Sequence, residues 1–128
     1  MAINALEFLE SIRHIPDDIK SLEIDLRNAI SRAYYCAYHV CEPKFQVTHH
    51  ENCGLHEDLI ESMIATNITS VRQIAFQLRK CKAKRVKADY KLNQNIYVSE
   101  AEQVIAEVQK IADNIEQLVN SGALLASS

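Results

Sequence analysis

The chain has 128 residues and a net charge of −3, and its 48% hydrophobic and 24% charged residues are typical of one globular domain. Only two glycines and two prolines occur, which argues against a sandwich or barrel of many short strands. No apolar run approaches the ~18 residues of a membrane span, and the acidic N-terminus does not resemble a signal peptide. With four unpatterned cysteines, these features predict a cytoplasmic protein without a membrane partner.

Apolar residues recur at helical spacing through the first half of the chain. The spacing predicts a helix over 2–14, which Pro16 interrupts, and a second over 18–41, which Pro43 ends. Residues 43–54 have no period and predict a loop. The expected core stripe of the second helix is Leu22, Leu26, Ala29, Ala33, Ala37 and Val40.

The second half of the chain continues this pattern. We expect a third helix over 55–64 and a fourth that Thr69 or Ser70 caps and that runs through Leu78. Residues 88–98 are rich in Asn and Tyr and predict an extended connection.

A fifth helix is the clearest in the sequence. Ser99 and Glu102 have capping-box spacing at its start, and Gly122 stands where a helix C-terminus is expected. The chain is therefore expected to form a single domain, 1–128, that is an all-α bundle of four to five helices.

The basic residues are concentrated in RKCKAKRVK, residues 79–87, which we expect to follow the end of the fourth helix. One interpretation is an RNA-binding surface that contacts phosphates. The alternatives are a solvated helix end and a surface for an acidic protein. The six predicted RNA-binding residues are Arg79, Lys80, Lys82, Lys84, Arg85 and Lys87.

Four polar residues of the second helix share one face, within a sector of roughly 60° and about 120° from the core stripe. They are Asn28, Arg32, Tyr35 and His39. Arg32 and His39 are two turns apart, ~10 Å along the axis. A solvated face or a structural Arg–His–Tyr network would also explain them.

The same four residues suit RNA cleavage without a metal or cofactor. Arginine stabilises charge on a phosphate, and histidine moves protons near neutral pH. The 2′-hydroxyl would attack the adjacent phosphorus and leave a 2′,3′-cyclic phosphate. Tyr35 would orient the phosphate, and Asn28 would fix the imidazole of His39.

The stretch SRAYYCAYHV, residues 31–40, resembles the signature of the HEPN (higher eukaryote and prokaryote nucleotide-binding) superfamily, in which His follows Arg after four to six residues. RVKADY, residues 85–90, looks like the segment that small prokaryotic members carry before their last helix. The resemblance is strongest over 20–118. It implies a homodimer in which the Arg/His helices of both protomers line one cleft.

Many such relatives are metal-independent endoribonucleases that act as toxins in toxin–antitoxin pairs or antiviral defence, commonly beside a nucleotidyltransferase-like antitoxin. Two positions depart from the pattern. Ala33 stands where active members often carry a polar residue, and Cys41 stands where some carry a tyrosine that the antitoxin modifies. Tyr34, Tyr35 and Tyr38 are the remaining candidate acceptors. The alternative is a non-catalytic module that binds nucleotide, RNA or a partner protein.

Two further motifs carry weaker predictions. His49, His50, Cys53 and His56 are zinc-ligand types, but no second ligand pair matches their spacing, so we expect a polar loop and no metal. Cys36 lies near His39 without an orienting acid and is expected to be a small buried residue.

Overall fold

The computed structural model describes residues 19–47 and 54–124. They form α2 (Ile19–Cys41), the 3₁₀ helix η1 (Glu42–Lys44), α3 (Leu55–Ile64), α4 (Thr69–Tyr90) and α5 (Val98–Asn120). This part of the chain contains no strand, which confirms an all-α helical bundle. None of its helices combines the length and apolar character that crossing a membrane requires. The helix predicted over 2–14 lies outside the described residues.

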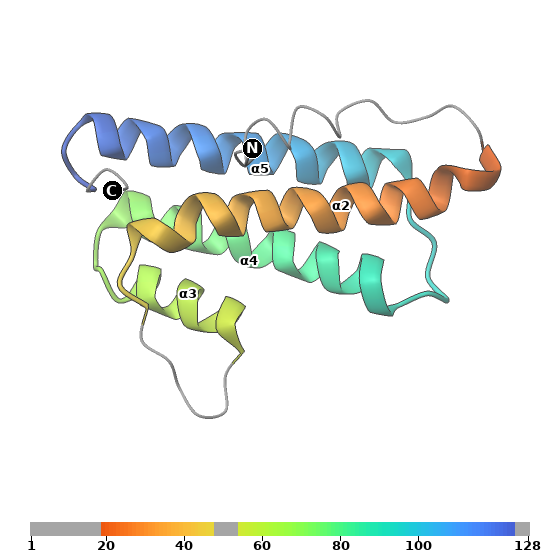
Figure 1. Cartoon of the computed structure of the whole chain (residues 1–128), viewed down its shortest axis with the longest axis horizontal. Coiled ribbons are helices and arrows are strands. Elements are labelled where there is room, and N and C mark those ends of the chain that lie inside the picture. The colour runs from red at the N-terminus through yellow and green to blue at the C-terminus, as the bar shows by residue number, and fades with distance from the viewer. Residues whose placement is uncertain (1–18, 48–53, 125–128) are drawn as a thin grey trace, which may run out of the picture.

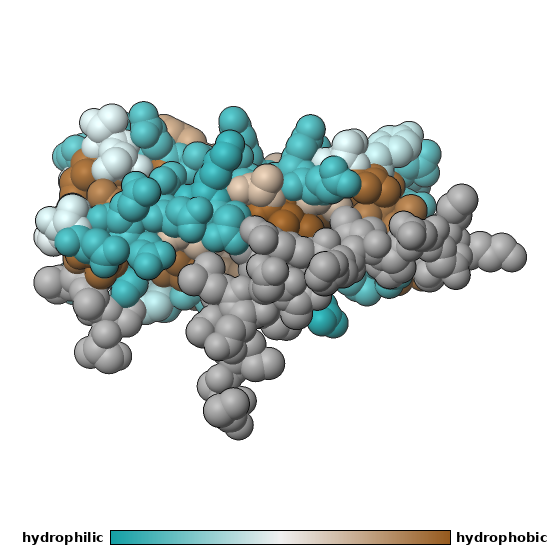
Figure 2. Space-filling model, turned by 90° about the horizontal axis from the view of Figure 1, so that it is seen from above, coloured by the Kyte–Doolittle hydropathy of each residue, from teal (hydrophilic) through white to brown (hydrophobic). Residues whose placement is uncertain are grey.

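Three long helices make the bundle, and α2 packs against both α4 and α5. Figure 1 shows α2 and α5 running in one direction and α4 in the other, with the short α3 beside α4. The face that includes α5 is mostly hydrophilic, with smaller hydrophobic areas between its polar side chains (Figure 2). The apolar side of α5 is therefore turned into the bundle.

The core stripe predicted for α2 is largely confirmed. Leu26, Ala29, Ala33 and Ala37 are buried, whereas Leu22 and Val40 at its ends are partly exposed. More of the circumference of α2 is buried than the predicted stripe alone, because α2 contacts two long helices. The additional buried residues of α2 are Arg27, Ile30, Tyr34, Cys36 and Cys41.

The fourth helix is longer than predicted, and this changes the place of the basic run. Residues 79–87 do not follow α4 but lie within it, and the connection to α5 is shorter than 88–98. Cys81 and Ala88 continue the buried stripe of α4 beyond Leu78, so packing extends along the helix. Lysine and arginine are good helix formers and do not interrupt it.

Arg27 of α2 contacts the C-terminal end of α4. It is only 9% exposed, and its guanidinium also bonds Glu23 Oε1 at 3.0 Å. Four backbone carbonyls accept hydrogen bonds from it: those of Lys87 (3.2 Å), Ala88 (3.0 Å), Lys91 (3.4 Å) and Gln94. The last carbonyls of a helix have few hydrogen-bond donors within the helix. Arg27 of α2 donates hydrogen bonds to these carbonyls at the end of α4.

The predicted side-chain caps at the helix starts are wrong. Ile68 and Tyr97 occupy the N-cap positions of α4 and α5, and neither helix has a capping side chain. The prediction for Gly122 is confirmed: its φ of 83° is left-handed, and its N–H bonds the Val119 carbonyl at 3.1 Å. The Ala123 N–H bonds the Leu118 carbonyl at 2.9 Å, which completes a Schellman motif.

Candidate active site

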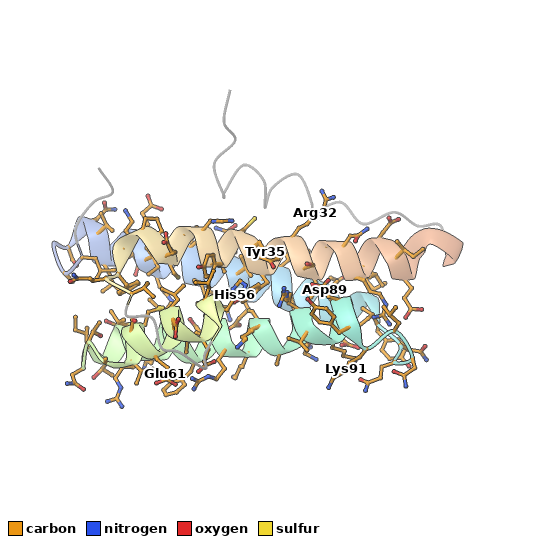
Figure 3. The ribbon with its side chains drawn as sticks, turned by 60° about the horizontal axis from the view of Figure 1, so that its bottom comes forward. Arg32, Tyr35, His56, Glu61, Asp89 and Lys91 are labelled. Atoms are coloured by element: carbon orange, nitrogen blue, oxygen red, sulfur yellow. The ribbon has the colours of Figure 1, made fainter. Side chains whose placement is uncertain are left out.

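The four polar residues predicted to share one face of α2 lie in two different environments. Asn28, Arg32 and His39 are exposed, whereas Tyr35 is half-buried. Figure 3 shows Arg32 pointing away from α4, while Tyr35 and His56 lie between α2 and the helices α3 and α4. The helix therefore presents its arginine to solvent and turns its tyrosine toward the neighbouring helices.

Spacing limits what this face can do within one protomer. Arg32 and His39 are two turns apart on one helix. Asn28 and His39 are eleven residues apart, roughly 16 Å along the axis, so Asn28 cannot orient this imidazole within its own chain. The role predicted for Asn28 requires a second protomer.

His56 of α3 joins the aromatic side chains of α2. Its ring centroid lies 5.2 Å from Tyr34, 5.5 Å from Tyr35 and 4.6 Å from Tyr38. His39 approaches two of the same rings, at 6.4 Å from Tyr35 and 5.5 Å from Tyr38. We call Tyr34, Tyr35, Tyr38, His39 and His56 the aromatic cluster. It brings both imidazoles against the same two phenol rings.

Arg85 of α4 links residues 85–90 to residues 31–40 of α2. Its Nη2 donates a hydrogen bond to the Tyr35 hydroxyl at 2.8 Å, and its Nε lies 3.0 Å from Asp89 Oδ2. Ser31 donates to the same carboxylate at 3.1 Å. The Arg85 side chain is 13% exposed, lies 5.3 Å from the centre of the Tyr35 ring, and positions the Tyr35 hydroxyl through its hydrogen bond.

The other bases of residues 79–87 do not face one surface. Arg79 and Lys82 pair with Glu57 of α3, and Arg79 also pairs with Glu61. Lys84 and Lys87 pair with Glu100 of α5, at 3.4 and 2.9 Å. Much of the basic charge is therefore balanced by acids of the same chain. RNA binding by this run stays a prediction, and Lys80 is its most exposed member.

Protonation follows from these surroundings. Burial, Arg85, Lys82 and His39 lower the pKa of His56, which is therefore neutral near pH 7. Burial raises the pKa of Tyr34 well above its ordinary value, so its hydroxyl keeps its proton. The pKa of Glu100 is lowered, chiefly by the hydrogen bond from Lys87.

Cysteine and metal chemistry find little support in the described part of the chain. Cys36 is buried, as predicted, and burial raises the pKa of its thiol to about 11, which is unfavourable for a nucleophile. Residues 19–47 and 54–124 hold no group of three or more potential metal ligands. The predicted loop residues His49, His50 and Cys53 lie outside these ranges.

Among the tyrosines considered as acceptors of a modification, Tyr34 is fully buried.

The sequence placed His56 only in a polar loop near a helix start. Its bond to Tyr34 joins residues 22 positions apart, and no local pattern indicates such a contact.

No family model, curated protein or solved structure matches this chain.

Proposed function

We propose that this protein is a metal-independent endoribonuclease of the HEPN type that acts as a toxin in a toxin–antitoxin or antiviral defence system. The observation that carries the proposal is the exposed pair Arg32 and His39 on one face of α2, beside the hydrogen-bonded Tyr35. A permanent cation and a titratable imidazole are the groups that phosphodiester cleavage requires.

In the proposed reaction the 2′-oxygen bonds to the adjacent phosphorus, and the bond from phosphorus to the 5′-oxygen breaks. His39 of the partner protomer accepts the proton of the 2′-hydroxyl and then donates this proton to the departing 5′-oxygen. Arg32 stabilises the charge on the pentacovalent phosphorane. The products are a 2′,3′-cyclic phosphate and a 5′-hydroxyl.

The proposal includes a homodimer in which the two α2 helices line one cleft. Two observations support it: Arg32 and His39 are both exposed, and two turns of helix separate them within one chain. A two-fold axis would place Arg32 of one protomer near His39 of the partner. RNA is the proposed substrate, and a nucleotidyltransferase-like protein is the proposed antitoxin.

The test is cleavage of a broad panel of RNAs by the purified protein in EDTA. Arg32→Ala and His39→Ala should each reduce the rate at least ~100-fold, because removing a proton-transfer group or a charge stabiliser costs this much. Arg72→Ala is the matched control, since Arg72 is an exposed arginine of α4, and it should cleave like the wild type.

Circular dichroism of each variant checks that its helices remain. Wild-type protein that cleaves no RNA in the panel, or a folded His39→Ala variant that cleaves normally, would overturn the proposal. The second candidate, a non-catalytic binding module, is favoured by the internal pairing of the basic run with Glu57, Glu61 and Glu100. It would be supported by RNA or nucleotide binding without cleavage.

A further inference from the structure

The hydrogen bond between Tyr34 and His56 determines which nitrogen of His56 carries the proton. The Tyr34 side chain is fully buried, and its hydroxyl lies 2.9 Å from Nδ1 of His56. A buried hydroxyl needs an acceptor for its proton, and this Nδ1 is its hydrogen-bond partner among the described side chains. Tyr34 therefore donates, Nδ1 accepts, and the proton of the neutral ring resides on Nε2.

The opposite arrangement is unfavourable. If Nδ1 carried the proton and donated it to Tyr34, the buried phenol proton would lose its acceptor. A doubly protonated His56 ring also leaves the Tyr34 hydroxyl proton without an acceptor, and it adds a positive charge near Arg85 and Lys82. The neutral Nε2–H tautomer satisfies both residues, which agrees with the lowered pKa of His56.

The surroundings of His56 favour an anion near this nitrogen. Positive charge on Arg85 and Lys82 of α4 and on His39 of α2 lowers the pKa of the ring, while Arg85 also lies beside Asp89 and Lys82 also pairs with Glu57. His56 is also the second residue of α3, whose N-terminal end carries partial positive charge. Gly54 at the N-cap adds no side chain, and open space surrounds the position that a Cβ would occupy there.

Two acids, Glu57 and Asp58, lie in the first turn of α3; Asp58 is buried, and Glu57 is paired with α4. Glu57 accepts hydrogen bonds from Arg79 and Lys82. Burial acts to raise the pKa of Glu57, but these two bonds outweigh it and the pKa is lowered. The charge of Glu57 is thus compensated by α4.

We propose that His56 binds a non-bridging phosphate oxygen of the RNA through its Nε2–H, as a neutral hydrogen-bond donor and not as a second base. The ring shares contacts to Tyr35 and Tyr38 with His39, so this donor lies next to the proposed proton-transfer group. The identity of the anion as RNA rests on the proposed function, whereas the tautomer does not.

The first experiment is a nitrogen-15 NMR measurement of the imidazole nitrogens at pH 7. We expect an unprotonated Nδ1 and a protonated Nε2 for His56. Tyr34→Phe removes only the hydroxyl and should abolish this single tautomer. A protonated Nδ1, or a charged ring in the wild type, would overturn the proposal.

The second experiment measures binding of a 2′-O-methyl oligoribonucleotide, which cannot cyclise and therefore reports binding without cleavage. His56→Gln places an amide N–H near the position of Nε2, whereas His56→Asn reaches only the position of Nδ1. Wild type and His56→Gln should bind within about threefold of each other, and His56→Asn should bind at least ~10-fold more weakly.

The two proposals fail in different ways. Cleavage by the wild type with equal oligonucleotide binding by His56→Asn would remove His56 from the site and leave the ribonuclease standing. Oligonucleotide binding that depends on His56, without cleavage of any RNA, would keep this inference and reject the enzyme. No binding of the oligonucleotide by the wild type would overturn the inference.

Discussion

Arg27 is a buried arginine that mainly binds backbone carbonyl oxygens. It bonds the carbonyls of Lys87, Ala88, Lys91 and Gln94, while Glu23 balances its charge. Glu23 also accepts the N–H of Ile96 at 3.3 Å. One side chain therefore holds together α2, the end of α4 and the turn into α5.

Replacing Arg27 should destabilise the fold. Arg27→Ala removes the donor of the buried Ala88 carbonyl and three further bonds at the end of α4, and should lower the free energy of unfolding by about 3 kcal/mol. Arg27→Lys keeps the charge but loses the fork of donors and should cost less. Urea denaturation followed by circular dichroism measures both variants.

The control is Arg72→Ala, which removes an exposed arginine of α4 and should change the unfolding free energy by less than about 0.5 kcal/mol. Equal stability of Arg27→Ala and Arg72→Ala would show that the bonds to the carbonyls contribute nothing.

Individual site residues differed in how well the sequence could place them. Helical periodicity correctly predicted that Asn28, Arg32 and His39 face away from the core, because that angle depends on one helix alone. The surroundings of Tyr35 depend on Arg85, fifty residues later, and those of His56 depend on Tyr34. Contacts between distant segments have no local pattern, so only the fold reveals them.

At the level of whole elements, apolar spacing predicted α2 and α3 within a residue or two of their ends. It failed for the end of α4, because the basic run has few apolar residues and resembles a solvated segment. In the basic run, ion pairs of Lys82 with Glu57 of α3 and of Lys87 with Glu100 of α5 favour the helical conformation. The caps failed because backbone geometry at Ile68 and Tyr97 begins these helices without a side-chain bond.

The two glycines of the chain form a matched pair for testing how α5 ends. Gly122 has a φ of 83°, whereas Gly54 has a φ of −76°, and open space surrounds both positions. Gly122→Ala should cost about 1 kcal/mol, because an alanine is strained in the left-handed region. Gly54→Ala should change stability by less than about 0.5 kcal/mol, because any residue adopts its backbone angles.

Thermal or urea denaturation of the two variants decides this prediction. If Gly122→Ala were as stable as Gly54→Ala, the left-handed residue would contribute nothing to ending α5.

At the scale of the whole molecule, α2 occupies a central position against both α4 and α5, yet one of its faces stays polar and exposed. The proposed dimer uses this face. A site shared across a two-fold axis takes its arginine from one chain and its histidine from the other.

Mixing two inactive variants tests this sharing. Arg32→Ala and His39→Ala proteins, unfolded together and refolded at equal concentrations, should recover about a quarter of wild-type cleavage. Half of the dimers are then mixed, and each mixed dimer holds one intact site. Sites confined to single protomers would give no recovery, and light scattering of the refolded sample would show whether dimers form.

The bonds of Arg27 also bear on the order in which the chain acquires its structure during synthesis. This residue leaves the ribosome before its carbonyl partners, which follow 60 to 67 positions later. The helix that contains it packs on α4 and on α5, the last described helix. Contacts so distant in sequence delay folding. A nascent chain that ends before α5 therefore exposes the apolar side of α2, and a chaperone that binds exposed apolar segments would bind there.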